Sequence, residues 1–292
     1  MKKKFQQISF LLFVLLAVAC LMNKYNVHPG EPFGIDWQAL DQVFVCHKLD
    51  PTSLPPFTEE AEGYYREGLR LWNTRNSAED VAAARIAFTK GAELGHWKAM
   101  NNLAIWAGLG RGGPQDYELT FQMYRNLARQ GAAIGYHSIG VLQQNGHFPF
   151  RKPDLAKTMR RYEQAALRGY AHSQVLIGTY QMYNLKREPE GLKWLHCADS
   201  QNYGPAATAI GRYTKIVERD YKLALVWYLR GGSLVDKGGG SGARILLRKG
   251  RYGIPKDLER SKCISKYMIQ VRKNPNKPIG DLAKLCPPSE GL

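Results

Sequence analysis

Two patterns of small residues alternate along this chain and return at a regular interval. In the first, a branched aliphatic residue precedes a small one; the pairs are spaced by 36, 38 and 33 residues and are Leu103-Ala104, Ile139-Gly140, Ile177-Gly178 and Ile210-Gly211. In the second, an aromatic residue stands three positions before a mostly small pair; the aromatics are Phe88, Tyr124, Tyr162, Trp194 and Tyr228. A period of about 20 to 50 residues is typical of stacked supersecondary units. The chain is therefore predicted to be a repeat protein.

The spacing inside each unit predicts helices. Residues three or four positions apart share one helical face, so a ring on one helix can fill the gap that a glycine or alanine leaves on its neighbour. No unit buries its apolar face alone, and stacking supplies the partner. Gly95, Gly131 and Gly169 stand where helix C-termini favour a left-handed residue. We predict an all-α solenoid with irregular N- and C-terminal caps, with helix pairs at 58–94, 96–131, 133–169, 170–202 and 203–232 and a degenerate sixth unit at 239–273.

The repeat unit resembles the Sel1-like repeat, a relative of the tetratricopeptide repeat. The resemblance is clearest from Leu155-Ala156 through Tyr162 and Ala165-Ala166 to Gly169, and it covers residues 58 to 270. It implies an α-solenoid of helix-turn-helix repeats that works by binding proteins. The stretch Phe44-Val45-Cys46 before the first repeat is similar to one in envelope Sel1-like proteins of proteobacteria. Several of those proteins give immunity, as antitoxins, to a secreted antibacterial phospholipase such as a type VI secretion effector.

Two glycine-rich segments need a separate interpretation. The repeat alignment breaks at Gly231 to Gly242, and Gly238 to Gly242 lacks the Gly-Lys-Ser/Thr ending of a phosphate loop, so we interpret it as a flexible joint. Gly108 to Gly113 satisfies the letter of the dinucleotide-binding pattern. That pattern needs a strand before it and a helix directly after it, whereas here a helix precedes and Pro114 follows. It is interpreted as a repeat loop, and no cofactor is predicted.

The first 19 residues are predicted to be a signal peptide. Lys2 to Lys4 precede an apolar run from Ile8 to Ala19, which has the length of a signal-peptide core and is short for a membrane span. The small residues before Cys20 resemble the lipobox of bacterial lipoproteins, although Ala17 replaces the usual leucine. The resemblance implies lipidation of Cys20 and, because Leu21 follows, the periplasmic face of the outer membrane. Ordinary cleavage to a soluble periplasmic protein, an uncleaved anchor and inner-membrane anchoring remain alternatives.

Proline-rich segments flank the predicted solenoid. Residues 20–57 hold five prolines, which forbid a continuous helix, and are expected to form a lipid tether and N-terminal cap. Within them Val43-Phe44-Val45 is a β-like run expected to lie against the first repeat; a mobile spacer is the alternative. Residues 274–292 hold four prolines and are expected to form an irregular strap.

The chain is strongly basic. It has 41 lysines and arginines against 25 acidic residues, a formal charge of +16, and removing three signal-peptide lysines leaves +13. In an exported protein this charge favours acidic proteins or lipid surfaces over nucleic acid. Eleven basic residues lie between Arg244 and Lys277, opposed only by Asp257 and Glu259. The cluster is interpreted either as a solvated face or as a docking patch for an acidic partner or anionic lipid.

Four cysteines remain when Cys20 is set aside. They are Cys46, Cys197, Cys263 and Cys286, an even number suited to an oxidising compartment, and three pairings are possible. Cys263 and Cys286 flank a proline-interrupted stretch and are our favoured bridge. The alternative is four small buried thiols. Cys197 occupies a small-residue position of the repeat and is interpreted as a core residue.

The sequence nominates no catalytic group and no metal ligand. The seven histidines include no His-x-x-x-His pair, and no Gly-x-Ser-x-Gly elbow is present. Candidate partner-binding residues are instead the large aromatics expected on the first helix of each unit and three arginines of the basic cluster, because aromatics and arginine often form the centre of an interface. They are Trp106, Tyr136, Tyr180, Tyr183, Tyr213, Arg248, Arg251 and Arg260. The alternative is that the aromatics pack between repeats.

Three hypotheses for function follow. The first is a periplasmic, lipid-anchored immunity protein, not an enzyme, that binds an acidic partner and neutralises a lipase or phospholipase effector. The second is an adaptor that organises cell-wall or secretion machinery in the envelope. The third is a secreted hydrolase such as a β-lactamase-like Sel1 protein, for which the sequence offers no catalytic constellation.

Overall fold

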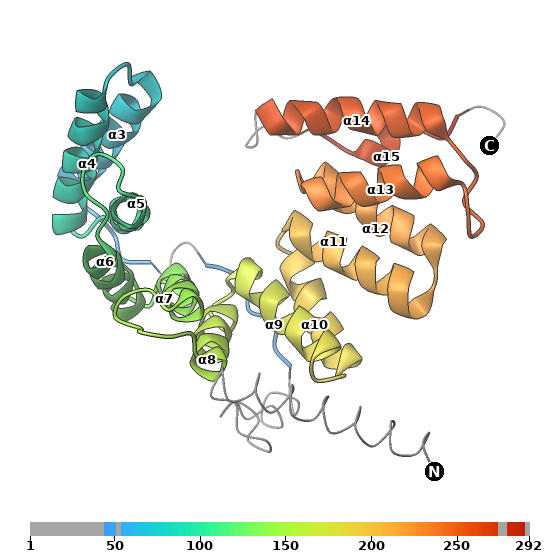
Figure 1. Cartoon of the computed structure of the whole chain (residues 1–292), viewed down its shortest axis with the longest axis horizontal. Coiled ribbons are helices and arrows are strands. Elements are labelled where there is room, and N and C mark those ends of the chain that lie inside the picture. Colours follow the sequence, from blue (N-terminus) through green and yellow to red (C-terminus); the bar gives the residue numbers. More distant parts are fainter. Residues whose placement is uncertain (1–43, 51–53, 274–278, 290–292) are drawn as a thin grey trace, which may run out of the picture. The chain divides into compact units, whose positions relative to one another are not determined.

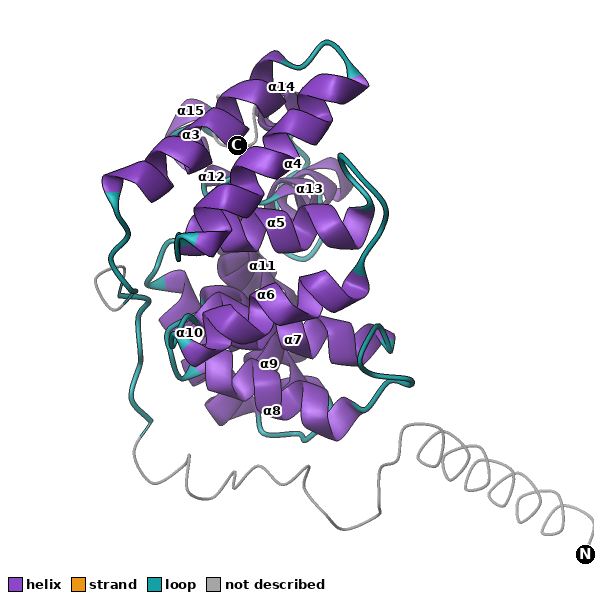
Figure 2. Cartoon of the chain, turned by 90° about the vertical axis from the view of Figure 1, so that its left-hand side faces the viewer, coloured by secondary structure: helices purple, strands orange, loops and turns teal. Residues whose placement is uncertain are grey.

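The computed structural model describes residues 44–50, 54–273 and 279–289, and all regular structure in these residues is helical (Figure 1 and Figure 2). The helices are α3 (Glu59–Thr74), α4 (Ala78–Glu93), α5 (Trp97–Leu109), α6 (Tyr117–Arg129), α7 (Ala133–Asn145), α8 (Leu155–Ala166), α9 (Ala171–Tyr183), α10 (Glu188–Asp199), α11 (Gly204–Tyr213), the π-helical η2 (Thr214–Glu218), α12 (Tyr221–Ser233), α13 (Lys237–Lys249), α14 (Leu258–Lys273) and α15 (Leu282–Leu285). The predicted all-α solenoid is confirmed. The predicted signal peptide and Cys20 lie outside the described residues.

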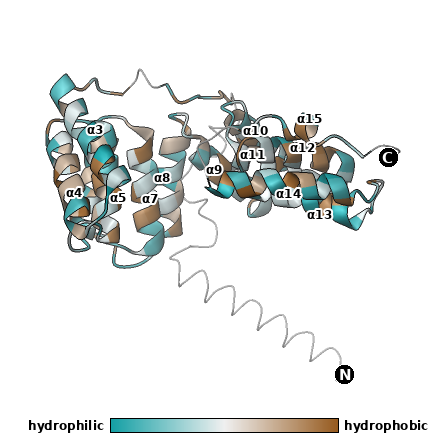
Figure 3. Cartoon of the chain, turned by 90° about the horizontal axis from the view of Figure 1, so that it is seen from above, coloured by the Kyte–Doolittle hydropathy of each residue, from teal (hydrophilic) through white to brown (hydrophobic). Residues whose placement is uncertain are grey.

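The chain forms two compact units. Among the described residues, unit 1 comprises residue 50 and residues 54–165, and unit 2 comprises residues 44–49, 166–273 and 279–289. In each unit successive helices pack on one another, as α3 does on α4 and α9 on α10. The helices mix hydrophobic and hydrophilic residues along their length, which is typical of helices with one buried face (Figure 3). None of the described helices is long and apolar enough to cross a membrane.

Aromatic rings nest against glycines, as the two alternating patterns predict. A Cβ added to Gly140 would lie 2.7 Å from the ring of Tyr162, and one added to Gly211 would lie 3.0 Å from the ring of Tyr228. The same added atom on Gly178 would lie 3.1 Å from Cβ of Trp194. These distances leave no room for a side chain, so the small residues allow neighbouring helices to approach closely.

The ends of the helices use two kinds of cap. Ser77 and Asp80 form a capping box at the start of α4, and Asp116, Asp220 and Asp236 cap α6, α12 and α13. At the start of α5, buried His96 accepts from the backbone N–H of Ala99 through Nδ1, and its Nε2 lies 2.8 Å from Glu62 Oε2. The expected left-handed glycines also occur, with φ of +85°, +81° and +81° at Gly95, Gly131 and Gly169.

The glycine-rich segment of unit 2 is helical, so the predicted flexible joint is wrong. Gly238 to Gly242 form the first turns of α13. A Cβ added to Gly239 would lie 2.6 Å from the backbone nitrogen of Gly232, and one added to Gly242 would lie 2.8 Å from the ring of Tyr228. Close packing against α12 therefore outweighs the low helix propensity of glycine. The unit expected to be degenerate contains two full helices, α13 and α14.

The C-terminal residues 279–289 return to the core of unit 2. Leu282, in the short helix α15, is fully buried against α12, and its backbone N–H donates to Ser233 Oγ. Cys286 is bonded to Cys263 of α14, with 5.8 Å between their Cα atoms. Asp257 accepts hydrogen bonds from the backbone N–H and the hydroxyl of Ser289. This segment is thus attached to unit 2 covalently and by packing.

Candidate functional site

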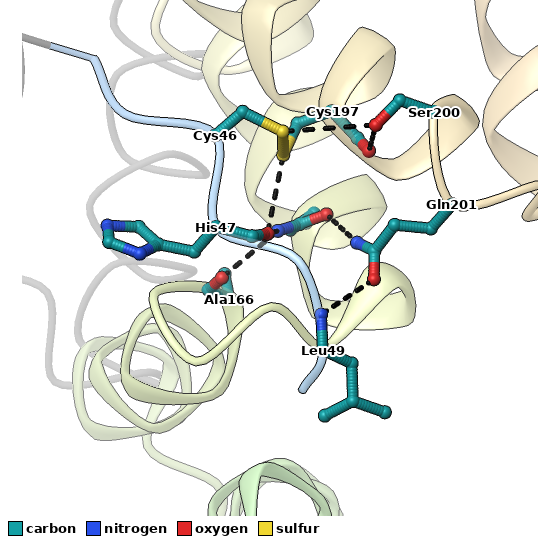
Figure 4. Close-up of a disulfide and its surroundings, with 8 residues drawn as sticks. Cys46, His47, Leu49, Ala166, Cys197, Ser200 and Gln201 are labelled. Carbon is teal, nitrogen blue, oxygen red and sulfur yellow. Dashed lines mark hydrogen bonds between the residues drawn. A yellow bond between two sulfur atoms is a disulfide. The ribbon is translucent and has the colours of Figure 1, made fainter. Parts of the chain in front are cut away.

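An extended segment from Phe44 to Leu49 lies against α9 and α10 (Figure 4). A disulfide joins Cys46 to Cys197 of α10, with 5.4 Å between their Cα atoms. The ring of Phe44 meets the ring of buried Trp194 edge to face at a centroid distance of 4.9 Å. We call residues 44–49 the N-terminal strap. The strap is held by one covalent bond and one aromatic contact on the same helix.

Two glutamines bind the backbone of the N-terminal strap. Gln174 of α9 is fully buried and donates from Nε2 to the carbonyl of His47 at 2.7 Å and to the carbonyl of Ala166 at 3.1 Å. Gln201 accepts from the backbone N–H of Leu49 at 2.9 Å and donates to Gln174 Oε1 at 2.9 Å (Figure 4). Unit 2 therefore already holds one extended peptide through side-chain amides, which satisfy its backbone groups.

Gly169 makes room for the strap. A Cβ added there would lie 2.2 Å from the backbone carbonyl carbon of Lys48, whereas one added to Gly95 or Gly131 would meet nothing within 4 Å. The three glycines share the same left-handed conformation. Of these three glycines, only Gly169 must also lack a side chain so that the backbone of the strap can pass close to it.

The location of the strap corrects one expectation from the sequence. Phe44 and Val45 do not form a strand, and the ring of Phe44 contacts α10 rather than the first helix pair. Cys197 is 3% exposed, as a core residue should be, but it is also bonded to Cys46. The even cysteine count was the one sequence signal for this bond, and spacing could not select it because 151 residues separate the partners.

The predicted aromatic residues do not form one exposed group. Trp106 is 5% exposed and packs on Phe88 in the core of unit 1, so it is wrong as a surface residue. Tyr136 is half-buried beside the same core. In unit 2, Tyr213 is buried and half-buried Tyr183 packs beside it. Their apolar rings are needed between helices, which explains the burial.

Burial also governs the ionisation of the tyrosines of unit 2. It raises the pKa of half-buried Tyr180 to about 12. It raises the pKa of Tyr213 as well, with smaller contributions from the carboxylates of Glu218 and Glu188 and from Tyr183. Burial raises the pKa of Tyr183, which nearby Arg212 partly opposes. These hydroxyls remain protonated at neutral pH and can donate hydrogen bonds.

The three predicted arginines have different surroundings. Arg248 and Arg251 are exposed and make no ion pair within the described residues. Arg260 is half-buried and donates from Nε to the carbonyl of Cys286 at 2.8 Å, and burial lowers its pKa. It therefore fastens the C-terminal segment and is wrong as a freely available docking group.

Positive charge is concentrated in unit 2. Residues 54–165 contain 14 basic and 11 acidic residues, whereas residues 166–292 contain 22 basic and 10 acidic residues. Part of the excess lies around two helix connections: residues 215–222, which run from η2 into the first residues of α12, and residues 248–256, which run from the last residues of α13 toward α14. We call these two segments the first and the second loop, and together the loop edge. The rings of Tyr221 and Tyr252 stack at 3.9 Å, so the two loops are neighbours.

The structure gives the remaining sequence candidates for a chemical site a structural role or, within the described residues, no companion groups that could hold a metal ion with them. The glycine-rich loop from Gly108 to Gly113 follows α5, and Arg85 donates to the carbonyl of Pro114 beside it at 3.1 Å. The described residues contain no group of three or more histidine, cysteine or acidic side chains that could hold a metal ion. Burial raises the pKa of Glu163 in α8 to about 7, and the charge of Arg160 partly opposes this shift.

Comparison with curated proteins finds Sel1 relatives for part of the chain. No family model matches the chain. Over 122 residues it is 27% identical to protein sel-1 homolog 2 of Homo sapiens, an alignment that covers 42% of this chain and 17% of that protein. The chain thus spans about a sixth of the length of the curated relatives it matches.

Solved structures match over most of the chain. The protein named Pseudomonas aeruginosa 5086 has a TM-score of 0.65 and 26% identity over 84% of this chain and 94% of its own. The immunity protein Pa5087 from Pseudomonas aeruginosa has a TM-score of 0.65 and 25% identity over the same shares. A Sel1 repeat protein from Oxalobacter formigenes has a TM-score of 0.59 and 19% identity over 71% of this chain and 84% of its own, which shows the fold alone.

Proposed function

We propose that this chain, which is a Sel1-like repeat protein, acts as an immunity protein that binds an antibacterial effector and blocks its activity. The observation that carries the proposal is the likeness to the immunity protein Pa5087 over 84% of this chain and 94% of that one. An α-solenoid presents a long row of helix faces and loops, which suits a protein partner better than a small molecule.

The construction of unit 2 supports a preformed binding surface. Disulfides attach the N-terminal strap to α10 and the C-terminal segment to α14, and buried Gln174 fixes the backbone of the strap. A surface that is rigid before binding loses less conformational entropy when the partner arrives. The exposed arginines Arg248 and Arg251 favour an acidic partner, because complementary charge speeds association.

The finer parts of the proposal come from the sequence. The effector is a lipase or phospholipase delivered to the periplasm, and the immunity protein meets it there. Lipidation at Cys20 holds the protein at the periplasmic face of the outer membrane. An export signal and even pairing of the four remaining cysteines are consistent with an oxidising compartment.

Coexpression tests the proposal. A secreted lipase encoded beside this chain is directed to the periplasm of a sensitive host, with and without the full chain. We expect restored growth and a stable complex in a pull-down from envelope extract, while an export-defective variant with Lys2 to Lys4 replaced by glutamate should not rescue. Failure to rescue together with no complex would overturn the proposal. A resident envelope partner and a growth defect without any effector would favour the adaptor hypothesis instead.

A further inference from the structure

We infer that the loop edge of unit 2 docks on an anionic lipid surface, an interaction that goes beyond effector binding. Its basic residues are Lys215, Arg219, Lys222, Arg248, Lys249, Arg251 and Lys256. Exposed apolar side chains stand among them, and they are Ile216, Val217, Leu223 and Tyr252 with exposed fractions of 56%, 47%, 42% and 63%. These cations form no ion pair within the described residues, although half-buried Lys215 lies over the ring of Tyr228, and their juxtaposition with exposed apolar side chains carries the inference.

The two loops form one surface. The ring of Tyr221 stacks on that of Tyr252, and a Cβ added to Gly253 would lie 3.4 Å from Cε of Lys222. Lys222 also lines a cavity of about 310 Å³ together with Ile254 and Pro255. Lys222 of the first loop therefore lies beside the second loop. Both loops stand at the same side of unit 2 (Figure 1).

The positive charge of the loop edge is not neutralised locally. None of its seven basic residues makes an ion pair within the described residues. Asp220 and Glu218 are the acidic residues of the first loop, and Asp220 Oδ1 is engaged in capping α12 through the backbone N–H of Leu223. Asp257, which follows the second loop, is buried and accepts from Ser289. A net positive potential remains at the loop tips.

An anionic bilayer fits this combination. Lysine and arginine are attracted to an anionic membrane surface, while apolar tips enter the boundary between headgroups and acyl chains. Tyrosine is favoured at the same depth. A lysine-rich face that served only solubility would not need Ile216, Val217 and Tyr252 exposed among its charges.

Vesicle cosedimentation of the full chain tests the inference. Vesicles of phosphatidylcholine alone are compared with vesicles containing phosphatidylglycerol, at 0.05 M and 0.5 M salt. We expect the wild-type chain to favour the anionic vesicles at low salt and to lose this preference at high salt, where screening is short-ranged. The N-terminal segment is the same in every variant, so differences between variants report on the loop edge.

A charge variant and a matched control distinguish the effect of the loop edge from the effect of the protein's net charge. Lys222, Arg251 and Lys256 are changed together to glutamate, and the control changes exposed Lys193, Lys237 and Lys266 to glutamate. Both variants lose the same total charge. The loop-edge variant should bind anionic vesicles about tenfold more weakly or worse, and the control should bind within about twofold of the wild type. Equal losses in both would overturn the inference.

A second pair of variants tests the apolar part. Ile216→Ser with Val217→Ser should reduce binding to anionic vesicles several-fold, whereas Ile86→Ser with Ile269→Ser, which changes equally exposed residues elsewhere, should not. Circular dichroism and thermal melting confirm that each variant is folded. If the wild type shows no preference for anionic vesicles, the inference fails. It also fails if the loop-edge variants lose only binding to the effector, because the surface then serves a protein. Effector rescue is scored separately, so failure of one proposal leaves the other intact.

Discussion

Unit 1 and unit 2 are built from the same kind of helix pair, yet they differ in what is added to the pairs. Within the described residues, unit 1 contains no disulfide, while unit 2 contains both, and each disulfide fixes a segment outside the repeated helices. The C-terminal part of the chain also has a much larger basic excess: residues 166–292 contain 22 basic and 10 acidic residues, against 14 and 11 in residues 54–165.

The repeated helix pairs themselves do not need cross-links. The core of unit 1, with Phe88 and Trp106 in contact, packs without a disulfide among its described residues. The disulfides of unit 2 instead attach residues 44–49 and 279–289, two short segments outside the repeated helices. Unit 2 is therefore the part of the chain that carries the disulfides, the attached segments and most of the positive charge.

Removing the disulfides should have the largest effect on stability and should fall on unit 2. Cys46→Ser with Cys197→Ser opens a link across 151 residues, and chain-entropy arguments give a loss of about 5 kcal/mol in unfolding free energy. Cys263→Ser with Cys286→Ser opens a link across 23 residues and should cost about 3 kcal/mol. Guanidinium unfolding of the full oxidised chain measures both. If opening the shorter link cost as much stability as opening the longer one, or more, loop-closure entropy would not be the origin of the stabilisation. The reduced wild-type chain, which lacks both disulfides, is the control.

Truncating one buried ring in each unit should separate packing from attachment of the strap. Trp194→Ala and Phe88→Ala each remove a side chain that is at most 2% exposed, and each should cost about 4 kcal/mol. Only Trp194 contacts Phe44, so only its truncation should speed reduction of the Cys46 disulfide by dithiothreitol. The rate is followed by alkylation of the released thiols. If both truncations speed reduction equally, the aromatic contact does not protect the bond.

The repeated features of the fold could be predicted from the sequence because several copies carry the same signal. Each copy places a ring against a small residue, and the contacts of Gly140 with Tyr162 and of Gly211 with Tyr228 follow that rule. The boundaries of the helix pairs follow from the same period. Averaging over copies compensates for weak propensity at any one position.

Features that occur once could not be predicted in this way. The bond from Cys46 to Cys197 depends on the folded path of the chain, and no local pattern selects it over other pairings. The helix at Gly238 to Gly242 forms because tight packing against α12 outweighs propensity, which a propensity argument cannot foresee. Trp106 was expected on a surface because the pattern does not say which face of its helix meets the neighbouring helix.

Gly95 in unit 1 and Gly169 in unit 2 share a left-handed backbone conformation but differ in what surrounds them. Gly95→Ala and Gly169→Ala both place a side chain at a left-handed residue, which should cost about 1 kcal/mol. At Gly169 the new Cβ would also meet the backbone of Lys48 at 2.2 Å, so this variant should lose about 2 kcal/mol more and partly release the strap. Thermal unfolding and limited proteolysis near residues 44–57 measure the two effects. Equal costs for the two glycines would show that the strap tolerates displacement.

The smallest expected effect lies in unit 1 and depends on pH. Burial raises the pKa of Glu163 to about 7, above the ordinary value of 4.5, with Arg160 opposing the shift. The unfolded chain therefore loses this proton at lower pH than the folded chain does, and stability falls as pH rises from about 4.5 to about 7. Glu163→Gln should remove that loss, leaving stability unchanged at pH 4 and raising it by about 1 kcal/mol at pH 8. Exposed Glu93→Gln is the control, and the same gain at pH 8 from both variants would assign the effect to net charge rather than to burial.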